Sequence, residues 1–528
     1  MDQDPKQLVH SFQEQMDVSV TGLVLGILGV FVLLRATFPT SISEDILPAV
    51  REEMLGLFGP VFAVLMILFV LFAVVVILGP WGDIRLGGPE ATPTYSYPAY
   101  FAMFFSAGIA AGIVFWAAAE PLFLYGFGTD AAGVAPFVGA EPGSSGAADG
   151  AMQTAFFHWG ISAWSAYVAL AIPIAYFVYN KGAPLRVSAL LMPLLGKENL
   201  ADHPISKLVD VLAVFATIGG VGVSVGFVGG QFLSGVEHQW GTETSTLDTT
   251  IVIAGITTVF TVSVITGVKR GIRRIAGVNV VLLALVAGLT LVLGPTRYIL
   301  ANTAGAFVDY GLNFLQMNVA AMTPGGNQDW YNAWTLFYWV WWFSWAPFAG
   351  LFLASISRGR KIRTVALTGV FGAGAATLLW FSIVGNAAIY TQAEGVANLL
   401  ALENVTDVAG FAMLETLPLG NLLVLGLFGL IVTWIVTSAD TSTLIISILG
   451  TKPGVAPGSV TRAFWGVLQG VMGLGLIVVG GADALQTAAV VTGGPIGVLV
   501  FVGIISLFVH FYREGFESEL EPKETTAD

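Results

Sequence analysis

The sequence predicts an all-α membrane protein that crosses the bilayer many times. Of its 528 residues, 55% are apolar and only 10% are charged, and the mean hydropathy is +0.81. A soluble globular domain carries about 25% charged residues. Apolar runs of about 20 residues, the length that crosses a bilayer, recur along the chain. Lys and Arg cluster in alternate connections between these runs, as the positive-inside rule requires.

Twelve apolar runs are expected to be transmembrane helices. They are residues 18–36, 58–79, 98–124, 152–179, 207–233, 249–268, 275–294, 330–356, 362–388, 420–449, 463–481 and 487–511. With a cytoplasmic N-terminus, eighteen basic residues lie inside and only Arg35, Arg51 and Arg297 lie outside. A missed or additional helix would move the later basic groups to the wrong side. The distribution therefore favours a multi-pass protein of the cell membrane with both termini in the cytoplasm.

Composition also excludes several classes of site and partner. The chain has no cysteine, so it holds neither a disulfide nor a cysteine-based metal site. Its five histidines are scattered without zinc-binding spacing, and no basic run suggests nucleic acid. No nucleophile, base or metal set indicates an enzyme. A lipid bilayer is the expected surrounding, and no organic cofactor is expected.

Two of the expected helices carry signs of an interruption. The third contains a run of small residues from Ser106 to Gly112, and the eighth contains Ser344 and Pro347 near its middle. Small residues also allow close helix packing in lipid, so two interpretations of the third helix remain open. In the other interpretation, the helix unwinds and its free N–H groups face an anionic ligand group.

These two helices are five apart, which predicts two five-helix repeats of opposite orientation, the arrangement of many secondary transporters. The division is then a cytoplasmic segment, two accessory helices, the first repeat, an amphipathic surface helix with its loop, the second repeat, and a short acidic cytoplasmic tail. The ranges are 1–17, 18–97, 98–294, 295–329, 330–511 and 512–528.

An aromatic cluster stands out in the eighth helix. Five tryptophans fall between Trp334 and Phe348, most of them at mid-depth, although tryptophan in membrane proteins usually lies at the interface. Such a cluster fits a cage for a quaternary ammonium group, which donates no hydrogen bond. Aromatic residues of the fourth helix are either packing residues or further walls of this cage. They are Trp159, Trp164 and Tyr167.

Polar residues inside other helices are the remaining candidates. Hydroxyls at Thr437, Ser438, Thr441 and Ser442 either bond to the preceding turn or supply oxygen ligands to Na⁺. Asp440 is a candidate functional carboxyl, or else it is solvated or paired with a cytoplasmic arginine. Glu120, before Pro121, is expected to be a helix-end residue in preference to a proton carrier.

Five segments together resemble the betaine/choline/carnitine transporter family. They are YWVWWFSWAPFAGLFLASISRGRKIR (338–363), DIRLG (83–87), AGIAAG followed by AEPL (107–122), HW with a later W and Y (158–167), and VTSADTST (436–443). The similarity covers residues 15 to 512 in order. It implies a LeuT-type fold of ten core helices with two extra N-terminal helices, and alternating-access transport of quaternary ammonium compounds.

The resemblance also implies site residues. The family's aromatic box falls on Trp159, Trp164, Tyr167, Trp339, Trp341, Trp342 and Trp345, and its glycine stretch on Gly108, Ala110 and Gly112. Its principal Na⁺ site falls on the Ser106 and Ile109 carbonyls with Trp434, Thr437 and Ser438. A second Na⁺ site falls near Thr217 and Phe348.

The chain departs from the family pattern in three places. The middle glycine is Ala110, a threonine of the second Na⁺ site is Val221, and Gly112 stands where choline-selective members carry an acidic residue. The resemblance therefore implies an Na⁺-coupled homotrimeric importer of glycine betaine or a related compatible solute. The alternative is a proton-coupled or ion-independent exchanger of choline- or carnitine-type substrates.

Overall fold

The structure is a computed structural model that describes residues 12–38, 40–109, 112–126 and 133–520. Within these ranges the side chains of 267–272 and 476–485 and of residues 35, 43, 109, 115, 223 and 518 are not described.

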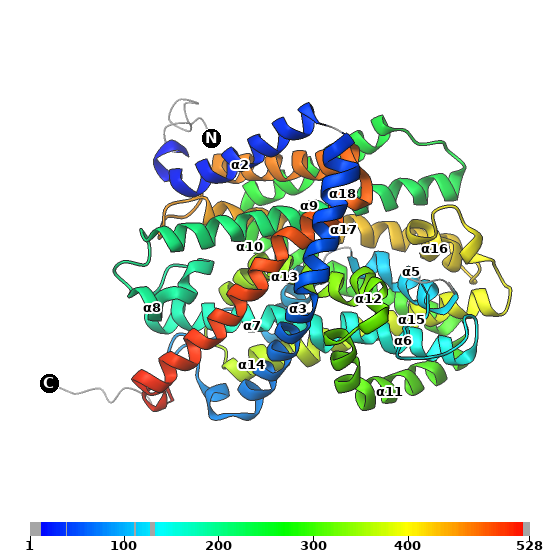
Figure 1. The fold of residues 1–528 in the computed structure, drawn as a ribbon, viewed down its shortest axis with the longest axis horizontal. Coiled ribbons are helices and arrows are strands. Elements are labelled where there is room, and N and C mark those ends of the chain that lie inside the picture. The colour runs from blue at the N-terminus through cyan, green and yellow to red at the C-terminus, as the bar shows by residue number, and fades with distance from the viewer. Residues whose placement is uncertain (1–11, 39, 110–111, 127–132, 521–528) are drawn as a thin grey trace.

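The described residues form a bundle of helices without a β-strand. The shorter helices, of at most fifteen residues, are α4 (Tyr97–Ile109), α5 (Gly112–Gly126), α6 (Ser145–Trp159), α8 (Met192–Leu195), α12 (Gln328–Tyr331), α14 (Ile362–Leu367) and α16 (Val405–Glu415). The longer ones are α2 (Val18–Thr37), α3 (Leu47–Leu78), α7 (Ile161–Lys181), α9 (Pro204–Trp240), α10 (Thr246–Leu293), α11 (Thr296–Met322), α13 (Phe337–Ile356), α15 (Gly374–Ala393), α17 (Gly420–Leu449) and α18 (Ser459–Glu514). Figure 1 shows α13 near the middle of the bundle, and α13 packs against α7, α9, α17 and α18.

Within the described residues, 9 helical segments are long and apolar enough to cross a membrane. The predicted fold class, an all-α polytopic membrane protein, is confirmed. The number of twelve and the division into repeats stay predictions. The central segments are buried almost throughout, at 94% of the apolar window for 325–356 and 89% for 145–181. Segment 246–266 is only 28% buried, so it lies at the outer edge of the bundle.

The helix α10 has 48 residues and covers two predicted spans, and its contacts show that it turns back on itself. Ser263 donates to Asp440, while Asn279 donates to Thr437 one turn earlier on α17. Sixteen residues of straight helix would separate Ser263 and Asn279 by about 24 Å. The chain therefore bends between them, and both halves of α10 lie against α17.

The same argument applies to α18, which has 56 residues. A Cβ on Gly473 would lie near Gly222 of α9, while Thr492 lies against Gly219 of the same helix. Nineteen residues of straight helix would span about 28 Å, but Gly219 and Gly222 are one turn apart. The predicted separation into spans at 463–481 and 487–511 agrees with this reversal.

One predicted interruption is not found where it was expected, and one break was not predicted. The helix α13 runs unbroken through Ser344 and Pro347, and the irregular turn is the π-helical stretch Asn332–Leu336 before it. Proline removes one backbone hydrogen bond, but neighbouring helices and hydroxyls compensate for it inside a bundle. The fourth predicted helix, expected to be continuous, breaks at Gly160 into α6 and α7. A Cβ there would meet the Phe156 carbonyl oxygen at 2.5 Å, so only glycine fits the break.

The DIRLG segment joins the accessory helix α3 to the connection after α13. Backbone bonds link Ile84 to Ile362 and Leu86 to Arg360, and the Asp83 carboxylate contacts Lys361 at 3.0 Å. The hydrogen bond from Lys361 is the main cause that lowers the pKa of Asp83. The predicted surface helix at 297–322 is α11, which packs on α6 and α15.

Asp407 of α16 lies outside the predicted spans, and burial raises its pKa to about 6. Because the folded state then holds this proton more tightly than the unfolded chain, stability is expected to fall as pH rises from about 4 to about 6. Asp407→Asn keeps an acceptor for the Ser234 hydroxyl, now 3.0 Å from the carboxylate. We expect it to remove this slope and to stabilise the protein at pH 7, by up to about 3 kcal/mol. Melting temperatures of both proteins across that pH range test this, and equal slopes would contradict it.

Candidate functional site

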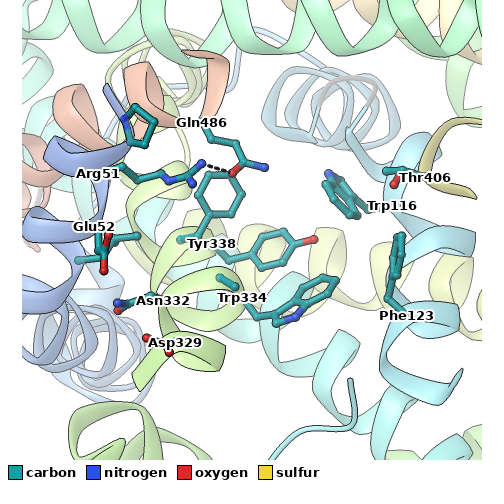
Figure 2. Close-up of a pocket in the computed structure, with 14 residues that line it drawn as sticks. Arg51, Glu52, Trp116, Phe123, Asp329, Asn332, Trp334, Tyr338, Thr406 and Gln486 are labelled. Atoms are coloured by element: carbon teal, nitrogen blue, oxygen red, sulfur yellow. Dashed lines mark hydrogen bonds between the residues drawn. The ribbon is translucent and has the colours of Figure 1, made fainter. Parts of the chain in front are cut away.

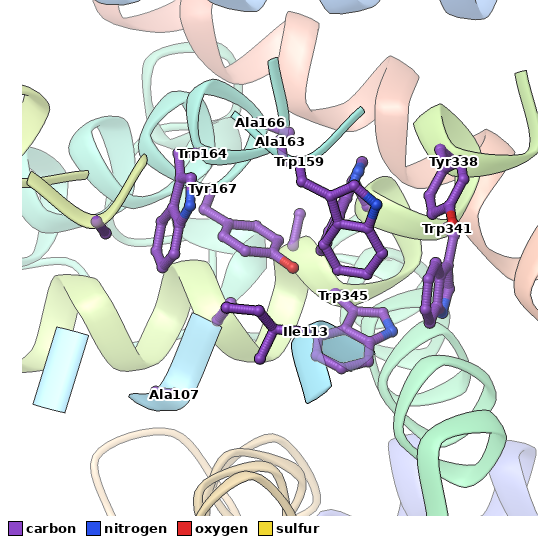
Figure 3. Close-up of a cluster of buried hydrophobic side chains, with 14 of the residues drawn as sticks. Ala107, Ile113, Trp159, Ala163, Trp164, Ala166, Tyr167, Tyr338, Trp341 and Trp345 are labelled. Carbon is purple, nitrogen blue, oxygen red and sulfur yellow. The ribbon is translucent and has the colours of Figure 1, made fainter. Parts of the chain in front are cut away.

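Six of the seven predicted aromatic residues form one buried cluster where α6, α7 and α13 meet. Trp159 lies with its ring centroid 5.0 Å from Trp342 and 6.0 Å from Trp341. Tyr167 links Trp164, at 5.8 Å, to Trp342, at 5.9 Å. Trp345 completes the set at 5.8 Å from Trp341. These rings are at most 2% exposed. Figure 3 shows Trp159, Tyr167 and Trp345 around Ile113, with Trp164 on one side and Trp341 on the other. They are called the ring cluster below: Trp159, Trp164, Tyr167, Trp341, Trp342 and Trp345.

The seventh residue, Trp339, is not brought into this cluster. It lies on another face of α13, 4.9 Å from Phe157 and 5.8 Å from His158. Two residues along a helix turn the side chain by about 200°, which explains why Trp339 and Trp341 point to different neighbours.

Three polar groups in the ring cluster have no hydrogen-bond partner. They are the Tyr167 hydroxyl and the indole N–H groups of Trp341 and Trp345. In Figure 3 the Tyr167 hydroxyl points into the space between Trp159, Trp345 and Ile113. A buried polar group without a partner costs about 1–3 kcal/mol. The arrangement therefore fits a ligand that carries a hydrogen-bond acceptor as well as an apolar cationic head.

Two glycines of the predicted stretch lie directly against these rings. A Cβ on Gly108 would meet the Trp164 ring at 2.7 Å, and one on Gly112 would meet Trp341 at 3.3 Å. The helix α4 therefore approaches the ring cluster at Gly108, one residue before its end, and α5 approaches it at Gly112, its first residue. Ala110 lies outside the described residues.

Hydrogen bonds hold three of the rings in place. Trp164 donates through Nε1 to the Thr377 hydroxyl at 3.1 Å, and Trp342 donates to the His158 carbonyl at 2.9 Å. Trp159 donates to the Glu120 carboxylate at 2.5 Å. Because these anchors come from α15, α6 and α5, the rings do not swing freely.

A second group of polar oxygens lies where α4, α10 and α17 meet. Thr437 accepts from Asn279 at 3.0 Å, and Ser106 donates to the Ala276 carbonyl of the same helix as Asn279. The Ser438 hydroxyl and the Asn279 amide oxygen are buried without a partner. Oxygen donors of this kind suit a hard cation.

The other residues predicted for this ion site flank the same junction. The Trp434 ring lies 5.6 Å from Phe105 of α4, one residue before Ser106. Ile109 is the last residue of α4, and its side chain is not described. The structure thus brings α4 and the hydroxyl-bearing turn of α17 together.

The residues predicted for a second ion site lie on α9 and α13. Thr217 donates to the Ala213 carbonyl one turn earlier at 2.8 Å, and Phe348 lies 5.5 Å from Trp345. Gly220, one turn after Thr217, lies against Trp345 and Ser344. Val221 is buried and supplies no oxygen there.

Two cavities lie on opposite sides of the ring cluster along α13. One of about 440 Å³ reaches Phe337 and Tyr338, with Trp116 and Trp334 on its wall (Figure 2). The other, of about 680 Å³, reaches Phe352, with Met103 of α4 and Leu444 of α17 on its wall. Because the tryptophans of α13 lie between Tyr338 and Phe352, the cluster separates the two cavities.

The structure corrects two predictions about carboxyl groups. Glu120 is not a helix-end residue: α5 continues six residues further, with Pro121 inside it, and Glu120 is fully buried. The solvated interpretation of Asp440 is also wrong, because Asp440 is fully buried and accepts from Ser263 at 2.6 Å.

Sequence reasoning missed Asn279, His158 and Tyr338. A lone asparagine in a predicted span is the one signal that pointed to Asn279. His158 and Tyr338 belong to segments that carry the family resemblance, but only the fold shows that both contact Glu120.

Comparisons with known proteins agree with this geometry. Residues 19–516 match the model of the betaine/carnitine/choline family of transporters. The chain belongs to this family. It is 33% identical over 498 residues to the glycine betaine transporter OpuD of Bacillus subtilis, covering 94% of each chain. It is 32% identical over 505 residues to glycine betaine transporter 1 of Vibrio parahaemolyticus, again covering 94% of each.

Members of the betaine/carnitine/choline family are transporters and not enzymes, so this chain is a multi-pass membrane transporter. The crystal structure of MhsT in complex with L-phenylalanine resembles 80% of this chain and 99% of its own, with a TM-score of 0.46 and 13% identity. That likeness is too low to support a conclusion about this chain.

Proposed function

We propose that this transporter imports glycine betaine, or a closely related quaternary ammonium solute, together with Na⁺ by alternating access. The observation that supports this most directly is the buried ring cluster with its three unpartnered donors. The trimethylammonium head would lie among the indole faces, where each cation–π contact contributes about 0.5–2 kcal/mol. The carboxylate would accept from Tyr167 and from N–H groups near Gly108 and Gly112.

The choice of a zwitterion over a bare cation rests on these same groups. Among the residues of the ring cluster there is no acidic side chain, whereas the unpartnered hydroxyl and indole N–H groups require an acceptor. Choline offers these donors one neutral hydroxyl oxygen, whereas the betaine carboxylate offers two charged oxygens that accept more and stronger hydrogen bonds. Equilibrium binding of betaine and choline tests this, and tighter binding of choline would contradict the assignment.

Na⁺ would bind between α4 and α17. Thr437, Ser438 and backbone carbonyls of Ser106 and Ile109 would supply its oxygens, with the unpartnered oxygen of Asn279 as an additional candidate. The ion would then link the segment that carries Gly108 to α17, so that binding favours closure around the substrate. The Thr217–Phe348 region is a candidate for a second ion.

Ser438→Ala tests the principal ion site. It removes a hydroxyl that donates to no protein group, so the fold should keep its stability while the Na⁺ concentration for half-maximal uptake rises about tenfold. Thr416→Ala is a matched control, because that hydroxyl lies outside the site and bonds only to its own turn. Radiolabelled betaine uptake into proteoliposomes across a series of Na⁺ concentrations measures both. Uptake that is unchanged without Na⁺ would refute the coupling.

A proton-coupled or ion-independent exchanger of choline- or carnitine-type substrates is the second candidate. The buried carboxyls Glu120 and Asp440 are the observation in its favour, because intramembrane carboxyls often mark proton pathways. A proton gradient imposed without Na⁺ separates the two: it should drive uptake only in this second case.

In this proposal the protein lies in the cell membrane with both termini in the cytoplasm, and it functions as a homotrimer. The net charge of −13 suits a salt-rich medium, in which imported solute would balance external osmolarity. Protease accessibility of the two termini in intact cells tests the topology, and crosslinking in membranes tests the trimer.

A further inference from the structure

Asp440 is a carboxyl inside α17 with one unsatisfied oxygen. Its side chain is fully buried. Oδ2 accepts from the Ser263 hydroxyl of α10 at 2.6 Å, whereas Oδ1 has no hydrogen-bond partner among the described residues. A buried carboxylate that uses only part of its acceptor capacity is costly unless a cation or a proton accompanies it. The groups around Asp440 indicate which of these partners it has.

Along α17, Asp440 lies between the proposed Na⁺ site and the cavity of about 680 Å³, which is called the inner cavity below. Residues three and four apart share one face of a helix, so Thr437, Asp440 and Leu444 follow one another along α17. Thr437 belongs to the proposed ion site, and Leu444 lines the inner cavity. An ion that moves along this face from Thr437 to the inner cavity therefore passes the Asp440 carboxylate.

The charged side chains that line the inner cavity are all basic. Among the described residues on its wall there is no carboxylate, and the basic ones are Arg186, Arg358, Lys452 and Arg462. A cation finds no negative partner on this wall. The acidic residue between the hydroxyls and the cavity is Asp440, which is also the one carboxyl in the sequence of α17.

Arg462, at the beginning of α18, is the basic residue of this wall that interacts with Asp440. The two side chains attract each other electrostatically. Arg462 Nη1 donates to the Val264 carbonyl of α10 at 3.2 Å, but its Nε is buried without a partner among the described residues, like Asp440 Oδ1. The pair thus leaves one donor and one acceptor unused. Arg462 can compensate the carboxylate more fully when no other cation does so.

We propose that Asp440 is a further Na⁺-binding residue, whose carboxylate takes the ion from the Thr437 and Ser438 hydroxyls on its way to the inner cavity. Arg462 then approaches the empty carboxylate. A carboxylate oxygen is a hard ligand that suits Na⁺, and the arginine weakens rebinding of the ion by repulsion. This inference rests on the proposed Na⁺ coupling and adds a release step to it.

Two variants separate ion transfer from a structural role. Asp440→Asn keeps an acceptor for Ser263 but removes the charge, whereas Ser263→Ala removes the hydrogen bond but keeps the charge. We expect Asp440→Asn to lower the maximal rate of betaine uptake about tenfold without raising the external Na⁺ concentration for half-maximal uptake, because a step after binding is slowed. Ser263→Ala should lower the rate far less. The opposite order would mean that Asp440 only joins α17 to α10, and would overturn the inference.

Internal Na⁺ tests the role of Arg462 with the carboxylate in place. In proteoliposomes that hold the protein right side out, Arg462→Gln should make uptake about tenfold more sensitive to inhibition by internal Na⁺, because no side-chain cation then competes for Asp440. Arg462→Lys keeps the charge and is the matched control, so its sensitivity should stay close to that of the wild type. Internal KCl keeps the ionic strength constant. Equal sensitivity of Arg462→Gln and the wild type would contradict this role.

Na⁺ binding without transport distinguishes this inference from the proposed function. Purified Ser438→Ala protein, in which the principal site is weakened, should still rise in melting temperature as NaCl replaces KCl. Ser438→Ala combined with Asp440→Asn should not. If betaine uptake requires Na⁺ but both proteins gain the same stability, Asp440 is not a ligand and the coupling stands. If uptake proceeds equally without Na⁺ but the gain depends on Asp440, the proposed coupling is wrong and Na⁺ binding by Asp440 stands.

Discussion

Valine at position 108 is expected to weaken betaine binding strongly in a protein that still folds. The first atom of any side chain there would lie 2.7 Å from the Trp164 ring and 3.4 Å from Tyr167. Trp164 cannot retreat easily, because it is fully buried and donates to Thr377. Overpacking of this kind costs about 1–3 kcal/mol, and here the cost falls on the rings that would hold the substrate. We expect alanine to weaken binding about tenfold and valine about 100-fold.

Two other glycines serve as controls for this variant. Gly112→Ala approaches Trp341 only to 3.3 Å and should have a smaller effect, while Gly29→Ala meets nothing within 4 Å and should behave as the wild type. Betaine binding by purified protein, with size-exclusion profiles to verify folding, measures all of them. Normal binding by Gly108→Val would mean that α4 and α5 do not close on the ring cluster.

Leucine in place of Trp341 is expected to weaken betaine binding about 100-fold, whereas phenylalanine should cost about tenfold. Trp341 lies between Trp159 and Trp345 in the ring cluster, and its N–H has no protein partner. The substitution therefore leaves no carbonyl unsatisfied, unlike the loss of Trp342, which bonds to the His158 carbonyl. An aromatic replacement keeps a π face toward the substrate and leucine does not.

Trp339→Leu is the matched control, because it removes the same side chain from the same helix. Its ring packs on Phe157 and His158 away from the ring cluster, so we expect a loss of stability with nearly unchanged affinity. Titration calorimetry gives the affinities and thermal melting gives the stabilities. If Trp339→Leu loses affinity as severely as Trp341→Leu, the division of α13 into two aromatic faces is incorrect.

Hydropathy and the spacing of apolar residues were sufficient to predict much of the fold. Residues 420–449, predicted as one helix, are the bounds of α17, because an apolar run in lipid must satisfy its own backbone. The i, i+4 spacing of Trp341 and Trp345 is that of one helix face, and their rings lie 5.8 Å apart in the structure. The same rule, applied to Trp339, would have placed it on another face.

The other features depend on tertiary contacts that no local pattern encodes. The break at Gly160 follows from crowding by the Phe156 carbonyl and Leu378, and a helix through Pro347 requires neighbours that compensate for a lost hydrogen bond. Glu120 precedes Pro121, and this proline predicted a helix end. The groups that bond the Glu120 carboxylate come from α6 and α13, 38 to 218 residues away, so no local pattern showed that it is buried. Asn279 could be recognised as a site residue only from the structure, in which the bend in α10 brings it to Thr437.

The central claim is that the rings of α6, α7 and α13 hold a positively charged methylated head. Binding of glycine betaine should therefore be compared with binding of 3,3-dimethylbutyrate, which has the same shape and carboxylate but a neutral carbon in place of the nitrogen. With several cation–π contacts of about 0.5–2 kcal/mol each, betaine should bind at least about tenfold more tightly to the wild type, and Trp341→Leu should reduce that ratio. Equal affinities for the two compounds would contradict the account.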